Sequence, residues 1–207
     1  MFVVGVDRLR LVWGTPMQEF ITAAISLILS NMTVTLLVVG LITAAIISLT
    51  GRRRHEAGFV SGTFLNQFLL FSVGVGYAYN FIMHSIFGEF TAKIIGWAQS
   101  PFQLEVAFAS LGFALVGFVA FPRRRAILVK FLALLGPAAF LWGAAGGHIY
   151  QIATTGNSAE GNAGSILYTD ILLPIIGFVF LWWHGMAVRR TGAAELGDPQ
   201  PNSASPM

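Results

Sequence analysis

Residues 32–54 read MTVTLLVVGLITAAIISLTGRRR, a long apolar run that ends directly at three arginines. A hydrocarbon core about 30 Å thick needs about 20 mainly apolar residues to be crossed by a helix. Arginines next to a span mark the end that stays on the cytoplasmic side. This stretch therefore predicts a transmembrane helix, and with it an integral membrane protein.

The rest of the chain repeats the pattern. Hydrophobic residues make up 56% of the sequence and charged residues only 10%, which is far from the balance of a soluble domain. Because backbone groups in lipid must be satisfied within their own segment, we expect helices. The predicted fold is an all-α, polytopic bundle of five spans forming one domain over residues 32–190. The spans are Met32–Thr50, Phe59–Phe87, Phe102–Phe121, Ala126–Gln151 and Ile166–Val188.

Two segments flank this bundle. Residues 17–31, MQEFITAAISLILSN, are partly apolar but too short to cross separately from the first span. We interpret residues 1–31 as an extracytoplasmic segment with an interfacial helix, which either lies on the membrane or extends the first span. Residues 191–207 are rich in Pro, Ser, Ala and Gly, which predicts a disordered cytoplasmic tail.

Three basic clusters fix the expected orientation. They occupy residues 52–54, 123–125 and 189–190, and each follows a predicted span. The positive-inside rule puts all three on the cytoplasmic side, with the N-terminus outside and the C-terminus in the cytoplasm. We therefore expect a multi-pass protein of the cytoplasmic (inner) membrane. The net charge of +3 comes mostly from these clusters, so it predicts no nucleic-acid partner. Membrane lipid, a second copy of the chain and a larger membrane complex remain as candidate partners.

Four ionisable side chains fall at one depth near the outer ends of four different spans: His84, Glu105, His148 and Asp170. Ionisable groups at this depth usually face the bundle interior or a water-filled cavity. Two imidazoles and two carboxylates suit a divalent metal such as Zn, Mn or Fe, whereas the absence of cysteine excludes thiolate sites. The sequence therefore predicts an outward-facing polar pocket, on the argument of depth alone.

Further polar residues surround this predicted pocket. Those expected to contact a bound ligand are Gln103, Tyr150, Gln151, Asn162 and Tyr168, beneath a loop over residues 151–165. Helical periodicity predicts one polar face in the second span from Asn66, Tyr77, Asn80 and His84. In the third span the same periodicity puts Glu105, Ala109 and Gly112 on one face small enough for close helix approach. Gly74 and Gly76 of the second span are interpreted as sites of close helix packing.

Several functions fit this pattern. The leading hypothesis is binding of a metal ion or small polar ligand in the outer pocket, and the runner-up is a non-catalytic accessory or assembly subunit. Proton or small-solute transport is third, because the spans between the outer cluster and the inner residues Asn66, Gln67 and Ser72 are largely apolar. Lys130 is interpreted as snorkelling to the interface and His184 as part of an aromatic belt.

A purely structural reading also remains open. In that reading the two carboxylates bond helix ends and the two histidines bond loop carbonyls, so that the polar cluster only fixes the loop in place. No motif of a known enzyme class appears, and the question of catalysis stays open.

Three stretches carry a resemblance: GWAQSPFQLEVAFASLGFALVG (residues 96–117), GAAGGHIYQI (143–152) and GNAGSILYTDILLP (161–174). In order and spacing they resemble a bacterial and archaeal family of small multi-helix membrane proteins that has no assigned function. The resemblance implies a multi-helix membrane fold and no particular activity. The residues that match its motifs are Trp97, Ser100, Pro101, Gln103, Glu105, His148, Tyr150, Gln151, Asn162, Gly164, Tyr168 and Asp170.

Overall fold

The computed structural model describes residues 18, 20, 21 and 31–197, with side chains as far as residue 190. Over these residues the regular structure is helical, and five helices are long and apolar enough to cross a membrane. The predicted all-α bundle of five spans is therefore confirmed. The interfacial helix expected within residues 1–31 falls almost wholly outside the described residues.

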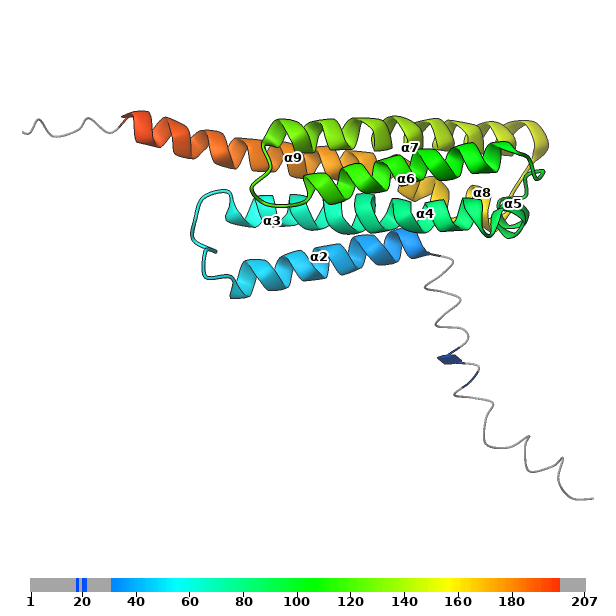
Figure 1. Ribbon diagram of the computed structural model, residues 1–207, viewed down its shortest axis with the longest axis horizontal. Coiled ribbons are helices and arrows are strands. Elements are labelled where there is room, and N and C mark those ends of the chain that lie inside the picture. The colour runs from blue at the N-terminus through cyan, green and yellow to red at the C-terminus, as the bar shows by residue number, and fades with distance from the viewer. Residues whose placement is uncertain (1–17, 19, 22–30, 198–207) are drawn as a thin grey trace, which may run out of the picture.

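The described part of the chain forms nine helical elements, of which α5 lies outside the five spans. In chain order these are α2 (Met32–Thr50), α3 (Phe59–Phe68), the π-helix η1 (Leu69–Val75), α4 (Gly76–Ser85), α5 (Gly88–Ile95), α6 (Phe102–Ala120), α7 (Ile127–Thr155), α8 (Glu160–Ala163) and α9 (Ser165–Gly197). Elements α3, η1 and α4 form one continuous rod, and the short helices α5 and α8 lie together at one end of the bundle (Figure 1). Helix α7 runs four residues past its predicted end at Gln151.

The rod of α3, η1 and α4 lies at the centre of the bundle. In its most apolar stretch 61% of the residues are buried, against 28% or less in each of the other four spans. Leu65, Leu69 and Val73 of the rod form the core together with residues of α6, α7 and α9, such as Ala114 and Leu134. Because the rod is surrounded, its polar side chains face protein rather than lipid.

The rod and α6 are in near backbone contact at a pair of glycines. A Cβ atom on Gly117 would lie 2.6 Å from the backbone nitrogen of Gly74, so no larger residue fits there. The predicted packing role of Gly74 agrees with this contact. Gly112, however, has no atom within 4 Å of where its Cβ would be, and Ala109 is exposed. The predicted close-packing face of the third span was therefore wrong, because the contact face of α6 lies on the other side of the helix.

The three basic clusters lie at the same end of the bundle, which carries the α2–α3 and α6–α7 loops and beyond which the last turns of α9 extend (Figure 1). The Arg123 guanidinium lies 4.0 Å from the centre of the Phe59 ring, which joins the two loops. Helix α9 continues to Gly197, so residues 191–197 are helical where a disordered tail was predicted. Alanine and leucine at 193, 194 and 196 favour this extension. Residues 198–207 of the predicted tail fall outside the described residues.

Candidate functional site

A network of buried polar side chains centres on Asn162 of α8, which is completely buried. Its Oδ1 accepts a hydrogen bond from Trp97 Nε1 at 3.1 Å, and its Nδ2 donates to the Asn157 carbonyl at 2.9 Å. These two bonds fix the orientation of the amide. His148 Nδ1, 2.8 Å from the same Oδ1, must therefore carry a proton and donate it. The network ties the start of the α5–α6 loop to α7 and α8.

The other nitrogen of the same imidazole faces Asp170 of α9. His148 Nε2 and Asp170 Oδ2 are 3.6 Å apart, and both side chains are almost completely buried. Within the described part of the chain, Asp170 has no other hydrogen-bond or ionic partner. The Trp97 ring lies against the imidazole, with 5.4 Å between ring centres, and shields it from the outside. The result is a closed carboxylate–imidazole pair inside the helix bundle.

The other two predicted metal ligands lie elsewhere. His84 of α4 bonds through Nδ1 to the side-chain oxygen of Gln103 of α6. Glu105 is exposed: it stands two residues, or about 200° of helix rotation, from the buried Ala107. In the part of the chain that the structure describes, no three His, Asp or Glu side chains are grouped so that they could hold a metal. The expected four-ligand cluster is therefore divided into one buried pair and two separate residues.

The residues predicted to contact a ligand do not lie together either. Asn162 belongs to the buried network and Gln103 is the partner of His84. Gln151 is half-buried and accepts a bond from the Thr155 hydroxyl, whereas Tyr150 and Tyr168 are 65% and 62% exposed. Trp97 and Asn157 were not predicted as members of the network. The signals that could have pointed to them were the family motif that contains Trp97 and the turn glycine Gly156, which directly precedes Asn157.

In the middle of the bundle the rod passes through its π-helical turn, next to a small cavity. The cavity has a volume of about 20 Å³ and is lined by Ser72, Tyr77, Pro137 and Pro174, among others. Among the described residues the Ser72 hydroxyl is buried without a hydrogen-bond partner, and the Tyr77 hydroxyl donates to the Pro137 carbonyl at 3.0 Å. Pro174 has no N–H, so it cannot donate to the carbonyl of Asp170 one turn earlier. A space of this size with such unsatisfied groups suits a single water molecule.

Lys130 of α7 is buried near the opposite end of the bundle, and only 1% of it is exposed. Its Nζ donates to Asn66 Oδ1 at 2.6 Å, to the Ala120 carbonyl at 3.0 Å and to the Pro122 carbonyl at 3.1 Å. The predicted snorkelling of Lys130 was therefore wrong. The reason is that the end of α6 offers carbonyl acceptors inside the bundle, close to the first turn of α7.

His184 of α9 also faces protein rather than an aromatic belt. Its Nδ1 lies 3.3 Å from the Ser61 hydroxyl of α3. Gly62 makes room for the ring, since a Cβ atom there would come within 2.9 Å of the imidazole. The interpretation of His184 as a belt residue was wrong, because this turn of α9 packs on α3.

The predicted polar face of the rod is shared between two neighbours. Asn66 and Tyr77 bond to α7, whereas Asn80 donates to Ser110 of α6 and His84 bonds to α6 as well. Polar groups therefore accompany the rod from one end to the other, but on two faces.

No curated protein and no solved structure matches the chain. One protein-family model does match, over residues 30–190, which include all five spans and the whole polar interior. That model carries the description of a family of unknown function, DUF6790. The chain, with its buried His148–Asp170 pair, therefore belongs to the DUF6790 family of unknown function.

Proposed function

We propose that this chain moves protons across the membrane, alone or together with a small solute, and that the His148–Asp170 pair is its proton-binding centre. The observation that carries the proposal is the 3.6 Å separation of His148 Nε2 and Asp170 Oδ2 in a closed, buried site. Ionisable pairs buried within membrane helices are typical of proton relays. Metal binding has less support, because a metal would need a third ligand beside this pair.

The hydrogen bonds of His148 explain how the pair could exchange a proton. Asn162 holds the proton on Nδ1, so a change of protonation at the imidazole must take place at Nε2, next to Asp170. A proton shared by Nε2 and the carboxyl can be on either group: one form is an ion pair and the other is neutral. Both forms have the same total charge, so proton transfer between the two groups leaves no unpaired charge in the membrane.

The next polar groups along the proposed path are those of the central cavity. Ser72 and Tyr77 line this cavity, and a water there would stand between Asp170 and the inner half of the bundle. From Ser72 to Asn66 the rod rises by about 9 Å, through a layer that contains the buried Leu69. This apolar layer closes the path in the present conformation, and water must enter it during transport.

Proton flux in liposomes tests the proposal. The full chain is reconstituted with a pH-sensitive dye inside the vesicles, and a potassium diffusion potential is applied. We expect flux with the parent chain and a loss to the level of empty liposomes with Asp170→Asn. Glu105→Gln is the matched control, because it neutralises an exposed carboxylate of the same half of the bundle. No flux with the parent, or equal flux with Asp170→Asn, would contradict the proposal.

Infrared difference spectroscopy tests proton binding separately from transport. The carbonyl band of a protonated, buried carboxyl group is compared between mildly acidic and mildly alkaline pH. We expect a pH-dependent band in the parent and in Glu105→Gln, and no such band in Asp170→Asn. His148→Gln should shift the pH at which the band appears, because it removes the only partner that Asp170 has among the described residues.

A further inference from the structure

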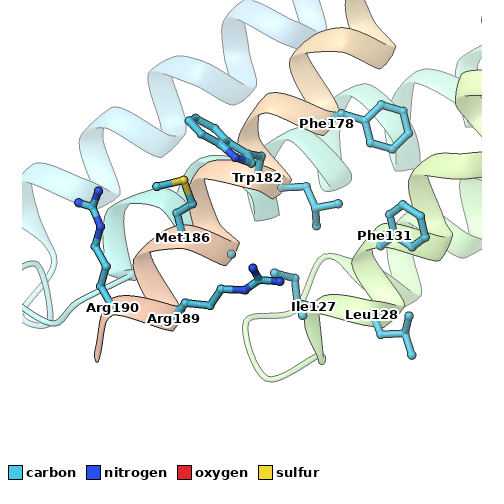
Figure 2. Close-up of a pocket in the computed structure, with 10 residues that line it drawn as sticks. Ile127, Leu128, Phe131, Phe178, Trp182, Met186, Arg189 and Arg190 are labelled. Atoms are coloured by element: carbon cyan, nitrogen blue, oxygen red, sulfur yellow. The ribbon is translucent and has the colours of Figure 1, made fainter. Parts of the chain in front are cut away.

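A groove runs between α7 and α9 at the end of the bundle that carries the basic clusters (Figure 2). Its volume is about 770 Å³, which is within the usual range for small-molecule sites. The walls are apolar, with Phe131 from α7 and with Phe178 and Trp182 from α9, and the groove ends at Arg189 and Arg190. It is separate from the polar interior, which lies around the rod.

The length of the groove matches one leaflet of a bilayer. From Phe178 to Arg189 helix α9 rises by about 17 Å, compared with about 15 Å for half of a 30 Å hydrocarbon core. The groove is open along its side, where Trp182 is 65% exposed and Leu128 is 62% exposed. A ligand with a long apolar part can therefore enter it sideways from the membrane.

The end of the groove is positively charged, and no described side chain compensates this charge. Among the residues whose side chains are described, neither Arg189 nor Arg190 has a hydrogen-bond or ionic partner, and none of the lining residues is acidic. The Arg189 side chain extends toward Ile127, at the start of α7 (Figure 2). Ala126 caps that helix without a side-chain hydrogen bond, so the positive end of the α7 dipole adds to the charge of the arginine.

We propose that this groove is a binding site for an anionic phospholipid. An acyl chain lies between Phe131 and Phe178, and the phosphate lies at Arg189, with Arg190 at the rim. A zwitterionic lipid would fill the apolar part equally well, but it brings no net negative charge to the two arginines. Basic pockets between membrane helices are typical sites for anionic head groups. The proposal is independent of proton transport, because it uses none of the residues of the polar interior.

Native mass spectrometry of the full chain in detergent tests the site, with phosphatidylglycerol and phosphatidylcholine as probes. We expect phosphatidylglycerol to bind about tenfold more tightly, given the charge of Arg189 at the head group and that of Arg190 at the rim. The double substitution Arg189→Gln with Arg190→Gln should remove this preference. Replacing both residues by Lys should keep most of it, because the positive charge remains.

A matched control removes two other arginines from the same end of the bundle. Arg52→Gln with Arg124→Gln changes the net charge equally, and both residues are exposed, so the lipid preference should persist. The unfolding midpoints of all variants in lipid-free detergent should agree, which would show that each one is folded. The proposal is overturned by equal affinity for the two lipids, or by an equal loss in the control. Displacement of the lipid by inorganic phosphate would also overturn it, because the site would then recognise a free anion.

Discussion

Lys130 Nζ lies 2.6 Å from Asn66 Oδ1, and this contact joins the first turn of α7 to the central rod inside the bundle. The same ammonium group donates to the carbonyls of Ala120 and Pro122 at the end of α6. All three of its N–H groups are therefore used, and its charge lies at the negative end of the α6 dipole. One side chain thus holds three spans together without any carboxylate.

This contact makes Lys130→Met strongly destabilising. We expect the free energy of unfolding to fall by roughly 2–4 kcal/mol, because three buried acceptors lose a charged donor. Denaturant unfolding in mixed micelles, followed by circular dichroism, measures the change. Lys93→Met is the control: Lys93 is exposed on α5, so its replacement should cost less than about 0.5 kcal/mol.

A double-mutant cycle isolates the contact between Lys130 and Asn66. Asn66→Leu alone leaves the ammonium short of one acceptor, whereas the double variant removes both partners. We expect the double variant to lose less stability than the sum of the two single variants, by about 1–2 kcal/mol. Additive losses would mean that the two side chains act independently, contrary to the 2.6 Å distance.

The glycine contact between η1 and α6 gives a second pair of matched variants. Gly117→Ala places a methyl group 2.6 Å from the Gly74 nitrogen, so the two helices must separate, and we expect a cost of about 1–3 kcal/mol. Gly112→Ala on the same helix meets no atom within 4 Å and should be neutral or stabilise by up to about 1 kcal/mol. The same unfolding measurement compares them, and equal costs would rule out close packing at Gly117.

Glu105 and Lys130 show what the sequence could and could not predict. The existence and depth of the spans depend on local runs of apolar residues and on the basic clusters, so the five-span fold was predictable. The rotation of a helix about its axis depends on its neighbours. Glu105 lies in the first turn of α6, but on the exposed face of that helix, because Ala107 and Gly117 fit against the rod instead.

Hydrogen bonds from side chains to backbone carbonyls could not be predicted from the sequence either. The partners of Lys130 include two carbonyls at the end of α6, and any sequence would supply these. By contrast, His148 and Asp170 have specific side-chain chemistry and were placed at one depth from the sequence. That they lie 3.6 Å apart, and that both lie away from Glu105, could be learned only from the three-dimensional packing of the helices.

An ion pair in the α2–α3 loop makes a small contribution to the stability of the fold, and this contribution depends on pH. Arg53 Nε donates to Glu56 Oε1 at 2.6 Å, and this hydrogen bond lowers the pKa of the Glu56 carboxyl below its ordinary value. A lowered folded-state pKa gives stability that is present above the unfolded-state pKa and lost as the pH falls through the folded-state pKa. Because both side chains are largely exposed, salt should screen the effect.

Thermal unfolding below about pH 4.3, the ordinary pKa of glutamate, measures this contribution at low ionic strength. We expect Glu56→Gln to lose less stability than the parent as the pH falls, and the difference to vanish in high salt. Glu89→Gln, which changes an exposed glutamate of α5, should follow the parent. A Glu56→Gln variant with the acid sensitivity of the parent would show that the pair does not contribute.

From the hydrogen bonds of Asn162 we predict that its side-chain amide holds residues 156–164, the connection between α7 and α9, in place. Asn162→Leu removes the acceptor of Trp97 Nε1 and of His148 Nδ1, and we expect a loss of about 2–3 kcal/mol because two buried donors become unsatisfied. Limited proteolysis should then cut within residues 156–164, where the parent resists. Tyr168→Phe, at an exposed position of the next helix, should leave the parent pattern unchanged.

Asn162→Asp separates the two roles of the amide, which are to accept hydrogen bonds through Oδ1 and to donate them through Nδ2. The carboxylate can still accept from Trp97 and His148, but it can no longer donate to the Asn157 carbonyl. If the acceptor oxygen is the essential part, the Asp variant keeps its resistance to protease and the Leu variant loses it. If both variants are cut equally, the bonds from Nδ2 to the carbonyls of Asn157 and His148 hold the connection, and the orientation of His148 would then depend on these bonds as well.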